Sequence, residues 1–217
     1  MGLKTVVVGH GDVAPEDREE IAGAETVIAA DGGAFALERW GITPQLVVGD
    51  LDSLGFEKAD ALGARGAKVI PFPAEKDESD LELAMRYALE TGADEIVLVG
   101  VFGGRLDHLL ANAMLIADPV YRGRGVRAVH GRTHVRAVYA NARVAIESPV
   151  GTTITLLPVH GDATGVRTRG LRYTLAVETL RFGRSRGLSN VVSAHPAWVS
   201  IDQGVLLLIE IREGGTA

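Results

Sequence analysis

Two carboxylates stand one residue apart in the run GDLDS at 49–53, directly after the apolar segment 46–48. On a short turn, Asp50 and Asp52 would repel each other by roughly 2 to 3 kcal/mol at about 6 Å and an effective dielectric constant near 20. A cation between them would offset that repulsion. Carboxylate oxygens suit Mg²⁺ or Ca²⁺, with Mg²⁺ the usual ion beside phosphates. The alternative is a solvated turn, in which aspartate is common.

Three other polar runs have side chains that could serve the same chemistry. They are Asp31-Gly32-Gly33, Lys76-Asp77-Glu78-Ser79-Asp80 and Gly103-Gly104-Arg105-Leu106-Asp107-His108. Plain structural roles are open to most of them, because Asp31 and Asp107 suit helix starts and Ser79 with Glu82 fits a capping box. Arg105 gains nothing from a helix N-terminus, yet it is well placed there to meet phosphate oxygens.

The elements that must position these runs form an alternating pattern of short β-rich segments and helices. The predicted strands are 5–8, 27–30, 46–48, 69–72 and 96–99, and the predicted helices are 34–40, 57–64, 79–89 and 107–117. This rhythm predicts an α/β fold, a Rossmann-like parallel sheet with flanking helices. Ligands bind at the carboxyl ends of the strands in such sheets, so the four polar runs should share one rim.

The pattern changes from about residue 133 onward to repeated β-type runs separated by Gly, Pro and Asn. These runs are 135–139, 144–146, 153–157, 172–179, 197–201 and 205–211, and they predict a C-terminal antiparallel β-sandwich domain. We therefore expect an α/β domain at 1–131 and a sandwich domain at 132–217. The segment 126–130 could be the last strand of the first domain, and 214–217 is expected to be a short tail.

Composition limits the class of protein. With 217 residues, of which 47% are hydrophobic and 23% charged, the chain should be globular. A formal net charge of -6 argues against nonspecific nucleic-acid binding, which needs a basic face. The apolar runs are too short to cross a membrane and the N-terminus lacks the pattern of a signal peptide, so we expect a cytoplasmic protein without a membrane partner. The chain contains no cysteine, which fits that compartment.

Two common nucleotide-binding patterns are weak or missing. The run 9–14 (GHGDVA) matches G-x-G-x-x-A, and Asp31 lies twenty positions beyond Gly11, which outlines a dinucleotide fingerprint and an NAD-dependent oxidoreductase. That interpretation leaves the other polar runs unused. The P-loop pattern G-x-x-x-x-G-K-[ST] does not occur, which excludes a P-loop kinase. Five histidines, His10 among them, are expected at the surface, and only His108 is a ligand candidate.

Taken together, the motifs resemble the thiamine pyrophosphokinase family. The matching residues are Asp31-Gly32-Gly33, Pro44 ahead of the run 49–53, the run 76–80, the run 103–108 with Asn112, Gly170-Leu171 to Tyr173, and Gly187-Leu188-Ser189-Asn190. The resemblance spans roughly residues 25 to 211. It implies an α/β ATP-binding domain followed by a thiamine-binding β-sandwich, and a homodimer whose active sites lie between subunits.

The resemblance also implies roles for individual residues. Asp50, Asp52 and Asp80 would be Mg²⁺ ligands and catalytic residues, together with Arg105 and Asp107, while Ser189 and Asn190 would contact thiamine. The nucleotide site would include Asp31, Gly32, Gly33, Ser53, Lys76, Asp77, Ser79, His108 and Asn112. Two departures from the family are Ser79, where threonine is frequent, and the run 205–208 (VLLL), where some members carry a thiamine-stacking tryptophan.

The implied reaction transfers the diphosphoryl group of ATP to the hydroxyl of thiamine, with AMP as the leaving group. Arg105 would stabilise charge on the transferred group, and Asp107 is the candidate to orient or deprotonate the hydroxyl. Pyrophosphorylation of another alcohol, such as a hydroxymethylpterin, is an alternative. A non-catalytic nucleotide or thiamine sensor is another.

Overall fold

The computed structural model describes residues 2–212, so the predicted tail at 214–217 lies outside the described residues. The chain divides into two compact units. The first runs to Leu115 and takes in Gly123–Gly131, and the second consists of Ile116–Arg122 and the chain from Arg132 onward.

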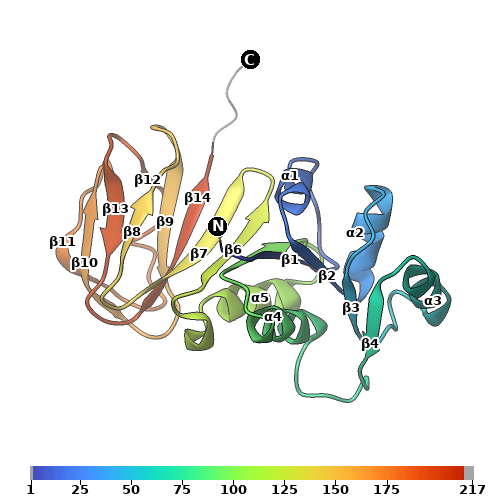
Figure 1. Cartoon of the computed structure of the whole chain (residues 1–217). Helices are drawn as coiled ribbons and strands as arrows, with labels where there is room; N and C mark the ends of the chain where they lie inside the picture. Colours follow the sequence, from blue (N-terminus) through green and yellow to red (C-terminus); the bar gives the residue numbers. More distant parts are fainter. Residues whose placement is uncertain (1, 213–217) are drawn as a thin grey trace. The chain divides into compact units, whose positions relative to one another are not determined.

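A parallel sheet forms the centre of the first unit (Figure 1). Its strands are β1 (Lys4–Val8), β2 (Thr26–Ala30), β3 (Leu46–Gly49), β4 (Lys68–Pro71), β5 (Glu95–Val99) and β6 (Gly125–His130). They are ordered β6-β5-β1-β2-β3-β4, and every neighbouring pair is parallel. The predicted parallel sheet is therefore confirmed, and 126–130 is its last strand along the chain.

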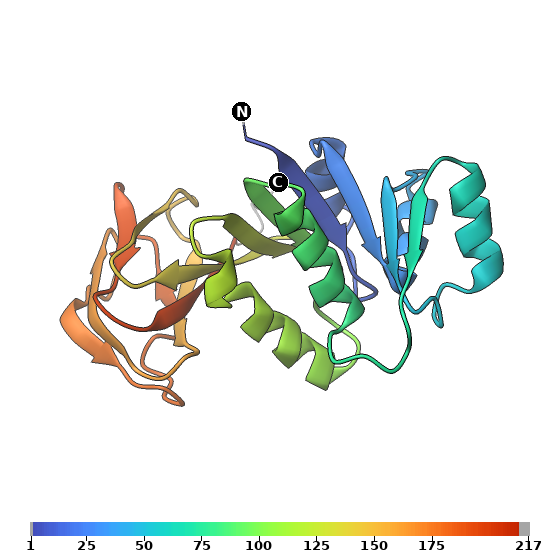
Figure 2. The same ribbon diagram turned by 60° about the horizontal axis from the view of Figure 1, so that its bottom comes forward.

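Helices cover both faces of this sheet. They are α1 (Asp17–Ala22), α2 (Ala34–Arg39), α3 (Phe56–Ala64), α4 (Asp80–Glu90) and α5 (Leu106–Ile116). Figures 1 and 2 show α4 and α5 on one face and α1 and α2 on the other. No helix within residues 2–212 combines the length and the apolar content needed to cross a membrane.

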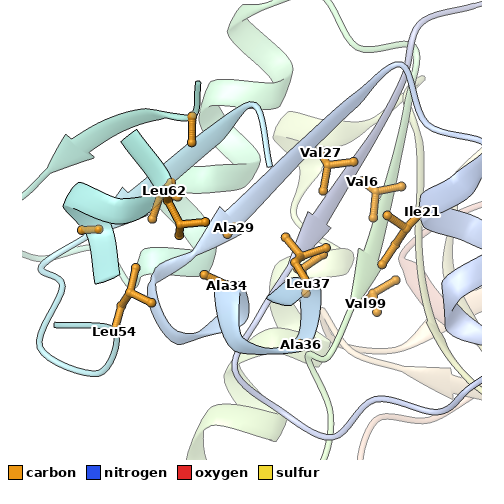
Figure 3. Packing of buried hydrophobic residues seen from close by; sticks show 14 of the residues in the cluster. Val6, Ile21, Val27, Ala29, Ala34, Ala36, Leu37, Leu54, Leu62 and Val99 are labelled. Carbon is orange, nitrogen blue, oxygen red and sulfur yellow. The ribbon is translucent and has the colours of Figure 1, made fainter. Parts of the chain in front are cut away.

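Burial on both faces explains why the central strands are continuous apolar runs. Val6 points to the face covered by α1 and α2, toward Ile21 and Leu37 (Figure 3), and Val8 belongs to the same core cluster. Val7, between them in β1, is also fully buried, and α4 contacts β1 from the opposite face. Strands that are buried on both sides lose the alternation of exposed strands and become uniformly hydrophobic.

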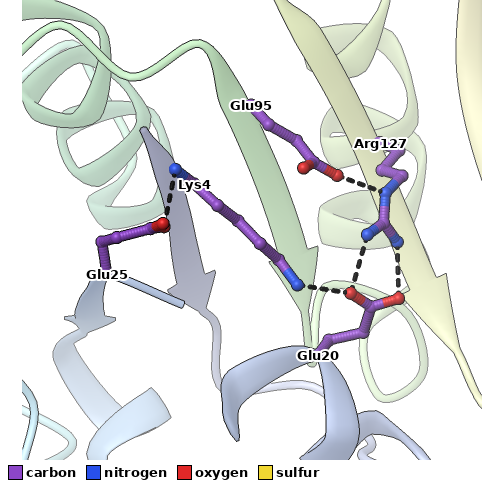
Figure 4. A network of polar contacts seen from close by, with 5 residues as sticks. All are labelled: Lys4, Glu20, Glu25, Glu95 and Arg127. Atoms are coloured by element: carbon purple, nitrogen blue, oxygen red, sulfur yellow. Dashed lines mark hydrogen bonds and ion pairs between the residues drawn. The ribbon is translucent and has the colours of Figure 1, made fainter. Parts of the chain in front are cut away.

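An ion-pair network joins α1 to the strands β1, β5 and β6 (Figure 4). Glu20 accepts hydrogen bonds from Lys4 Nζ at 2.8 Å and from Arg127 Nη1 and Nη2 at 2.7 Å. Arg127 Nε donates to Glu95 at 2.9 Å. The hydrogen bonds from Arg127, opposed by burial and assisted by Lys4, lower the pKa of Glu20 to about 2.

The second unit is an antiparallel sandwich, as the sequence predicts. Its strands are β7 (Thr133–Tyr139), β8 (Arg143–Ile146), β9 (Thr153–Pro158), β10 (Ala163–Arg169), β11 (Ala176–Leu180), β12 (Asn190–Val191), β13 (Ala197–Ser200) and β14 (Val205–Ile211). Four are ordered β12-β9-β14-β7 and four are ordered β11-β10-β13-β8. Ile154 and Leu206 from the first group share one core with Ile146 and Val199 from the second.

Four elements differ from the sequence-based prediction, and one of them is the two-residue strand β12, which was not predicted. The predicted strand 172–179 begins only at Ala176, because the chain turns before it. Strand β10 (Ala163–Arg169) is missing from the prediction, and its pairing with β11 shifts register twice, which disrupts the alternation of buried and exposed residues. The six-residue helix α1 was also not predicted, because it is too short for a helical repeat to stand out.

We predict that Glu20→Gln lowers the free energy of unfolding at neutral pH by about 1.5 to 3 kcal/mol, the usual contribution of a hydrogen bond to a charged group. The pKa of Glu20 is depressed from 4.5 to about 2 in the folded protein. Its stabilisation is therefore complete above the unfolded value and is lost as the pH falls toward the folded value. Urea unfolding should show the difference from wild type shrinking between about pH 5 and about pH 3.

Glu38→Gln is the matched control for this prediction. Glu38 pairs with Lys58 at 2.9 Å, and the two side chains are 54% and 47% exposed. Exposed pairs contribute little because water screens them, so this variant should unfold nearly like the wild type. A stability loss in Glu20→Gln that is the same at every pH would contradict the assignment.

Candidate active site

The first unit contains a cleft of about 510 Å³ at the carboxyl ends of its parallel strands, a volume in the range of small-molecule sites. Residues from all the predicted polar runs line it. They are Asp31, Asp50, Asp52, Ser53, Ser79, Asp80, Arg105, His108 and Asn112. Lys76, Asp77 and Asp107 do not line it, although Lys76 reaches two of its carboxylates.

The loop after β3 presents two aspartates on either side of a buried leucine. Leu51 is 3% exposed and packs in the core cluster of the first unit, and its φ of +65° lies in the left-handed region. The amide of Asp52 donates to Asp50 Oδ1 at 3.2 Å, which closes the turn. The core thus holds the leucine, and the two carboxylates on either side of it face the cleft.

Asp31 fixes the same loop from the end of β2. Its carboxylate is almost fully buried and accepts hydrogen bonds from the amides of Ser53 and Leu54, both at 3.2 Å. Asp31 has a φ of +41°, a strained conformation for a residue with a side chain. Such strain at a buried carboxylate is typical of a functional site.

Carboxylate oxygens of Asp31, Asp50 and Asp52 lie within 4.8 Å of one another. An added Cβ on Gly49, which has a φ of +150°, would lie 2.8 Å from Asp31 Cβ and 3.0 Å from Asp80 Cγ. Asp80 therefore reaches the same place from the start of α4. Hard oxygen ligands at this density suit a divalent cation such as Mg²⁺.

A lysine bridges two of the predicted metal ligands. Lys76 Nζ lies 3.1 Å from Asp50 Oδ2 and 3.1 Å from Asp80 Oδ1. Burial raises the pKa of Asp80, and the charges of Asp50 and Asp31 add to that shift against the effect of Lys76. Burial also acts on Asp50, but hydrogen bonds from the Asp52 amide and Lys76 outweigh it and lower the pKa of Asp50.

Ser79 and Asp77 of the run 76–80 differ in their surroundings. Ser79 is the N-cap of α4, and its hydroxyl accepts a hydrogen bond from the Glu82 amide at 3.2 Å. The capping role considered for Ser79 is thus present, and the residue also lines the cleft. Asp77 is exposed.

The start of α5 carries a paired arginine and aspartate. Arg105 Nη2 lies 2.5 Å from Asp107 Oδ2, and the side chains are 72% and 63% exposed. This hydrogen bond lowers the pKa of Asp107 to about 2. One turn further along, Asn112 donates to the carbonyl of Val101 at 2.7 Å and so ties the helix to the loop after β5.

The second unit has a cavity of its own, lined by Leu156, Tyr173, Leu188 and Asn190 among others. Asn190 is buried, accepts from the Tyr173 amide at 3.0 Å and donates to the Tyr173 carbonyl at 2.7 Å. Its amide group therefore braces the chain beside the cavity. Ser189 is exposed, with a φ of +57°.

Two family models match the chain in the order of its two units. The model for the catalytic domain of thiamin pyrophosphokinase matches residues 18–127, half of the chain. The chain belongs to the thiamine pyrophosphokinase family. The model for the vitamin B1 binding domain of the same family matches residues 142–206.

Individual members of the thiamine pyrophosphokinase family agree with this assignment. The thiamine pyrophosphokinase of Bacillus subtilis is 28% identical over 183 residues, which are 84% of this chain and 85% of that protein. Its crystal structure superposes with a TM-score of 0.84 and covers 97% of this chain and 100% of that one, at 25% identity. A family protein from Enterococcus faecalis gives a TM-score of 0.83 at 26% identity, with the same coverage.

His10 is exposed, as the sequence prediction expects, and it also lines this family member's cleft, which that prediction did not include. It follows β1, lines the cleft, and its ring lies 5.8 Å from the ring of Phe35. An added Cβ on Gly32 would lie 2.4 Å from His10 Nδ1, so the glycine makes room for the imidazole. The G-x-G-x-x-A pattern was the available signal, since it places 9–11 at a strand end.

We predict that Gly49→Ala lowers the free energy of unfolding by about 1 to 3 kcal/mol more than Gly55→Ala does, the usual range for overpacking. Both glycines have positive φ, but an added Cβ meets Asp31 and Asp80 at Gly49 and nothing within 4 Å at Gly55. Urea unfolding of the two variants measures both losses of stability, and the difference between them gives the contribution of crowding by the added Cβ beyond that of backbone strain. Equal losses would show that the close approach of the carboxylates to Gly49 has no energetic consequence.

Proposed function

We propose that this chain transfers the diphosphoryl group of ATP to the hydroxyl of thiamine, giving thiamine diphosphate and AMP. The observation that carries this proposal is the match of both family domains in order, together with the carboxylate-lined cleft inside the catalytic one. The named relatives are thiamine pyrophosphokinases. They give no support to a hydroxymethylpterin substrate or to a non-catalytic sensor.

The reaction forms one bond to phosphorus and breaks another. The hydroxyl oxygen of thiamine attacks the β-phosphorus of ATP, and the bond between that phosphorus and the oxygen bridging to the α-phosphorus breaks. The bridging oxygen leaves with AMP, and the hydroxyl proton passes to an acceptor or to water. Enzymes catalyse phosphoryl transfer mainly by positioning the reactants and neutralising charge, so the charged residues of the cleft are the functional ones.

Magnesium fits the carboxylates of the cleft. We propose that Asp50, Asp52 and Asp80 hold Mg²⁺ and that Asp31, which the structure adds to the acidic group, takes part with them. The ion would neutralise phosphate charge when bound. Ser53, Ser79, His108 and Asn112 line the cleft and remain nucleotide-site candidates beside the glycines of the Asp31 turn.

Arg105 and Asp107 act as a pair in this proposal. Arg105 lines the cleft and is the residue that would stabilise charge on the transferred group. Asp107 holds the guanidinium, and its pKa of about 2 makes it a weak proton acceptor. We therefore assign Asp107 the positioning of Arg105 and not the deprotonation of the hydroxyl.

Three predictions from the sequence complete the proposal. Ser189 and Asn190 are proposed as thiamine contacts, because they match the family motif and because Asn190 lines the cavity of the second unit. The protein is proposed to act as a homodimer with active sites between subunits. It is proposed to be cytoplasmic and to bind neither nucleic acid nor a membrane.

Purified protein should release AMP from ATP and Mg²⁺ only when thiamine is present. Thiamine diphosphate should accumulate in equal amount, measured by chromatography. Hydroxymethylpterin, supplied in place of thiamine, should release no AMP. Binding of ATP and thiamine without AMP release would overturn the proposed activity and favour a sensor.

Asp52→Asn should lower the rate of AMP release at least about 100-fold and raise the Mg²⁺ concentration needed for half-maximal rate, because one anionic ligand is lost. Its far-ultraviolet circular dichroism should match the wild type, since Asp52 is exposed. Asp60→Asn, on an exposed position of α3, is the control and should keep the wild-type rate. An unchanged rate in Asp52→Asn would refute its metal role.

A further inference from the structure

The ammonium group of Lys76 occupies a position between two carboxylates of the cleft. It lies 3.1 Å from an oxygen of Asp50 and 3.1 Å from an oxygen of Asp80, and its side chain is only 12% exposed. Lys76 stands in the connection between β4 and α4, four residues before Asp80, the first residue of the helix. The long side chain of Lys76 is therefore mostly buried, and its ammonium group lies where two carboxylates favour a cation.

Asp80 depends on this lysine for its polar contact. The Oδ1 atom of Asp80 is buried, and among residues 2–212 it has no hydrogen-bond partner of good geometry. The ion pair with Lys76 Nζ is the contact recorded for that oxygen. Removing the ammonium would leave a buried carboxylate oxygen facing the negative charges of Asp50 and Asp31, an arrangement that is strongly unfavourable.

Asp50 belongs to two groups of charges at once. One of its oxygens pairs with Lys76, and Asp50 also lies in the carboxylate cluster with Asp31 and Asp52. A divalent cation among those three carboxylates would repel the ammonium and compete with it for the charge of Asp50. The two cations therefore compete for the same carboxylate, and binding of one disfavours the other.

We propose that Lys76 is a tethered counter-cation of the carboxylate cluster, which stabilises the cluster without metal and leaves Asp50 when a divalent cation binds. The inference rests on the proposed metal role of the cluster. Departure of the ammonium frees Asp50 and Asp80 as ligands. It also turns a positive charge toward the space where phosphate oxygens of the nucleotide would lie.

Metal affinity without substrates provides the first test. In isothermal titration with Mg²⁺ alone, Lys76→Met should bind the ion about tenfold more tightly than wild type, within the usual range of coupling between two bound groups. Its melting temperature should fall in EDTA and recover more on adding Mg²⁺ than that of the wild type. Lys76→Arg, which keeps the charge, should stay near wild type in both measurements.

Lys58→Met is the matched control for the loss of a lysine. Lys58 pairs with Glu38 at 2.9 Å on an exposed surface and lies outside the cleft, so Mg²⁺ affinity should not change in this variant. Unchanged or weaker Mg²⁺ binding in Lys76→Met would overturn the proposal, because a competing cation must lower the affinity for the metal.

A second measurement uses the wild-type protein and does not depend on the folding of a variant. Acetylation by a limiting amount of acetic anhydride, read by peptide mass spectrometry, should be slow at Lys76 in EDTA and faster once Mg²⁺ is added. Lys58, at 47% exposure, is the internal reference and should react equally in both conditions. Equal reactivity of Lys76 with and without Mg²⁺ would refute its release.

Neither assay contains ATP or thiamine. Failure of the protein to release AMP would therefore overturn the proposed function and leave the role of Lys76 standing, whereas the outcomes named above would overturn the role of Lys76 alone.

Discussion

Mutual repulsion among Asp31, Asp50, Asp52 and Asp80 is the constraint around which the first unit is organised. Parallel strands bring these carboxylates to one edge of the sheet, where they would push the loops apart if nothing opposed them. Backbone amides of Ser53 and Leu54 hold Asp31, and Lys76 holds Asp50 and Asp80. Part of the charge that a metal would neutralise is thus already balanced by the chain.

The parallel sheet and the polar residues along its edge could be predicted from the sequence, because the hydrophobic pattern of the strands matches their burial. Strands β1, β2, β3 and β5 are buried on both faces and read as apolar runs. The polar runs that start at Asp31, Gly49 and Gly103 follow β2, β3 and β5, whereas the run 76–80 follows the more exposed β4. Strand β10 could not be found in this way, since its register shifts break the pattern. Most of the residues that line the cleft could be predicted for the same topological reason, because the positions of the strand ends follow from those of the strands.

Pairings between side chains could not be predicted, because they depend on directions that sequence spacing does not contain. Arg105 and Asp107 are two positions apart, and only the structure shows that they engage each other. Asp31 lies in the acidic cluster with a positive φ, a backbone conformation that few non-glycine residues adopt and that the sequence does not reveal. The place of His10 in the cleft was not predicted, because it depends on the room left by a glycine from another strand end.

Leu51 links the interior of the protein to its chemistry. The residue is part of the packed core and at the same time the spacer between Asp50 and Asp52. Protein interiors tolerate little change in volume. The packing of Leu51 in the core therefore sets the separation of the two carboxylates. A substitution that changes the volume of the core beneath this loop would therefore alter the distance between the two carboxylates, although the substituted residue itself lies outside the cleft.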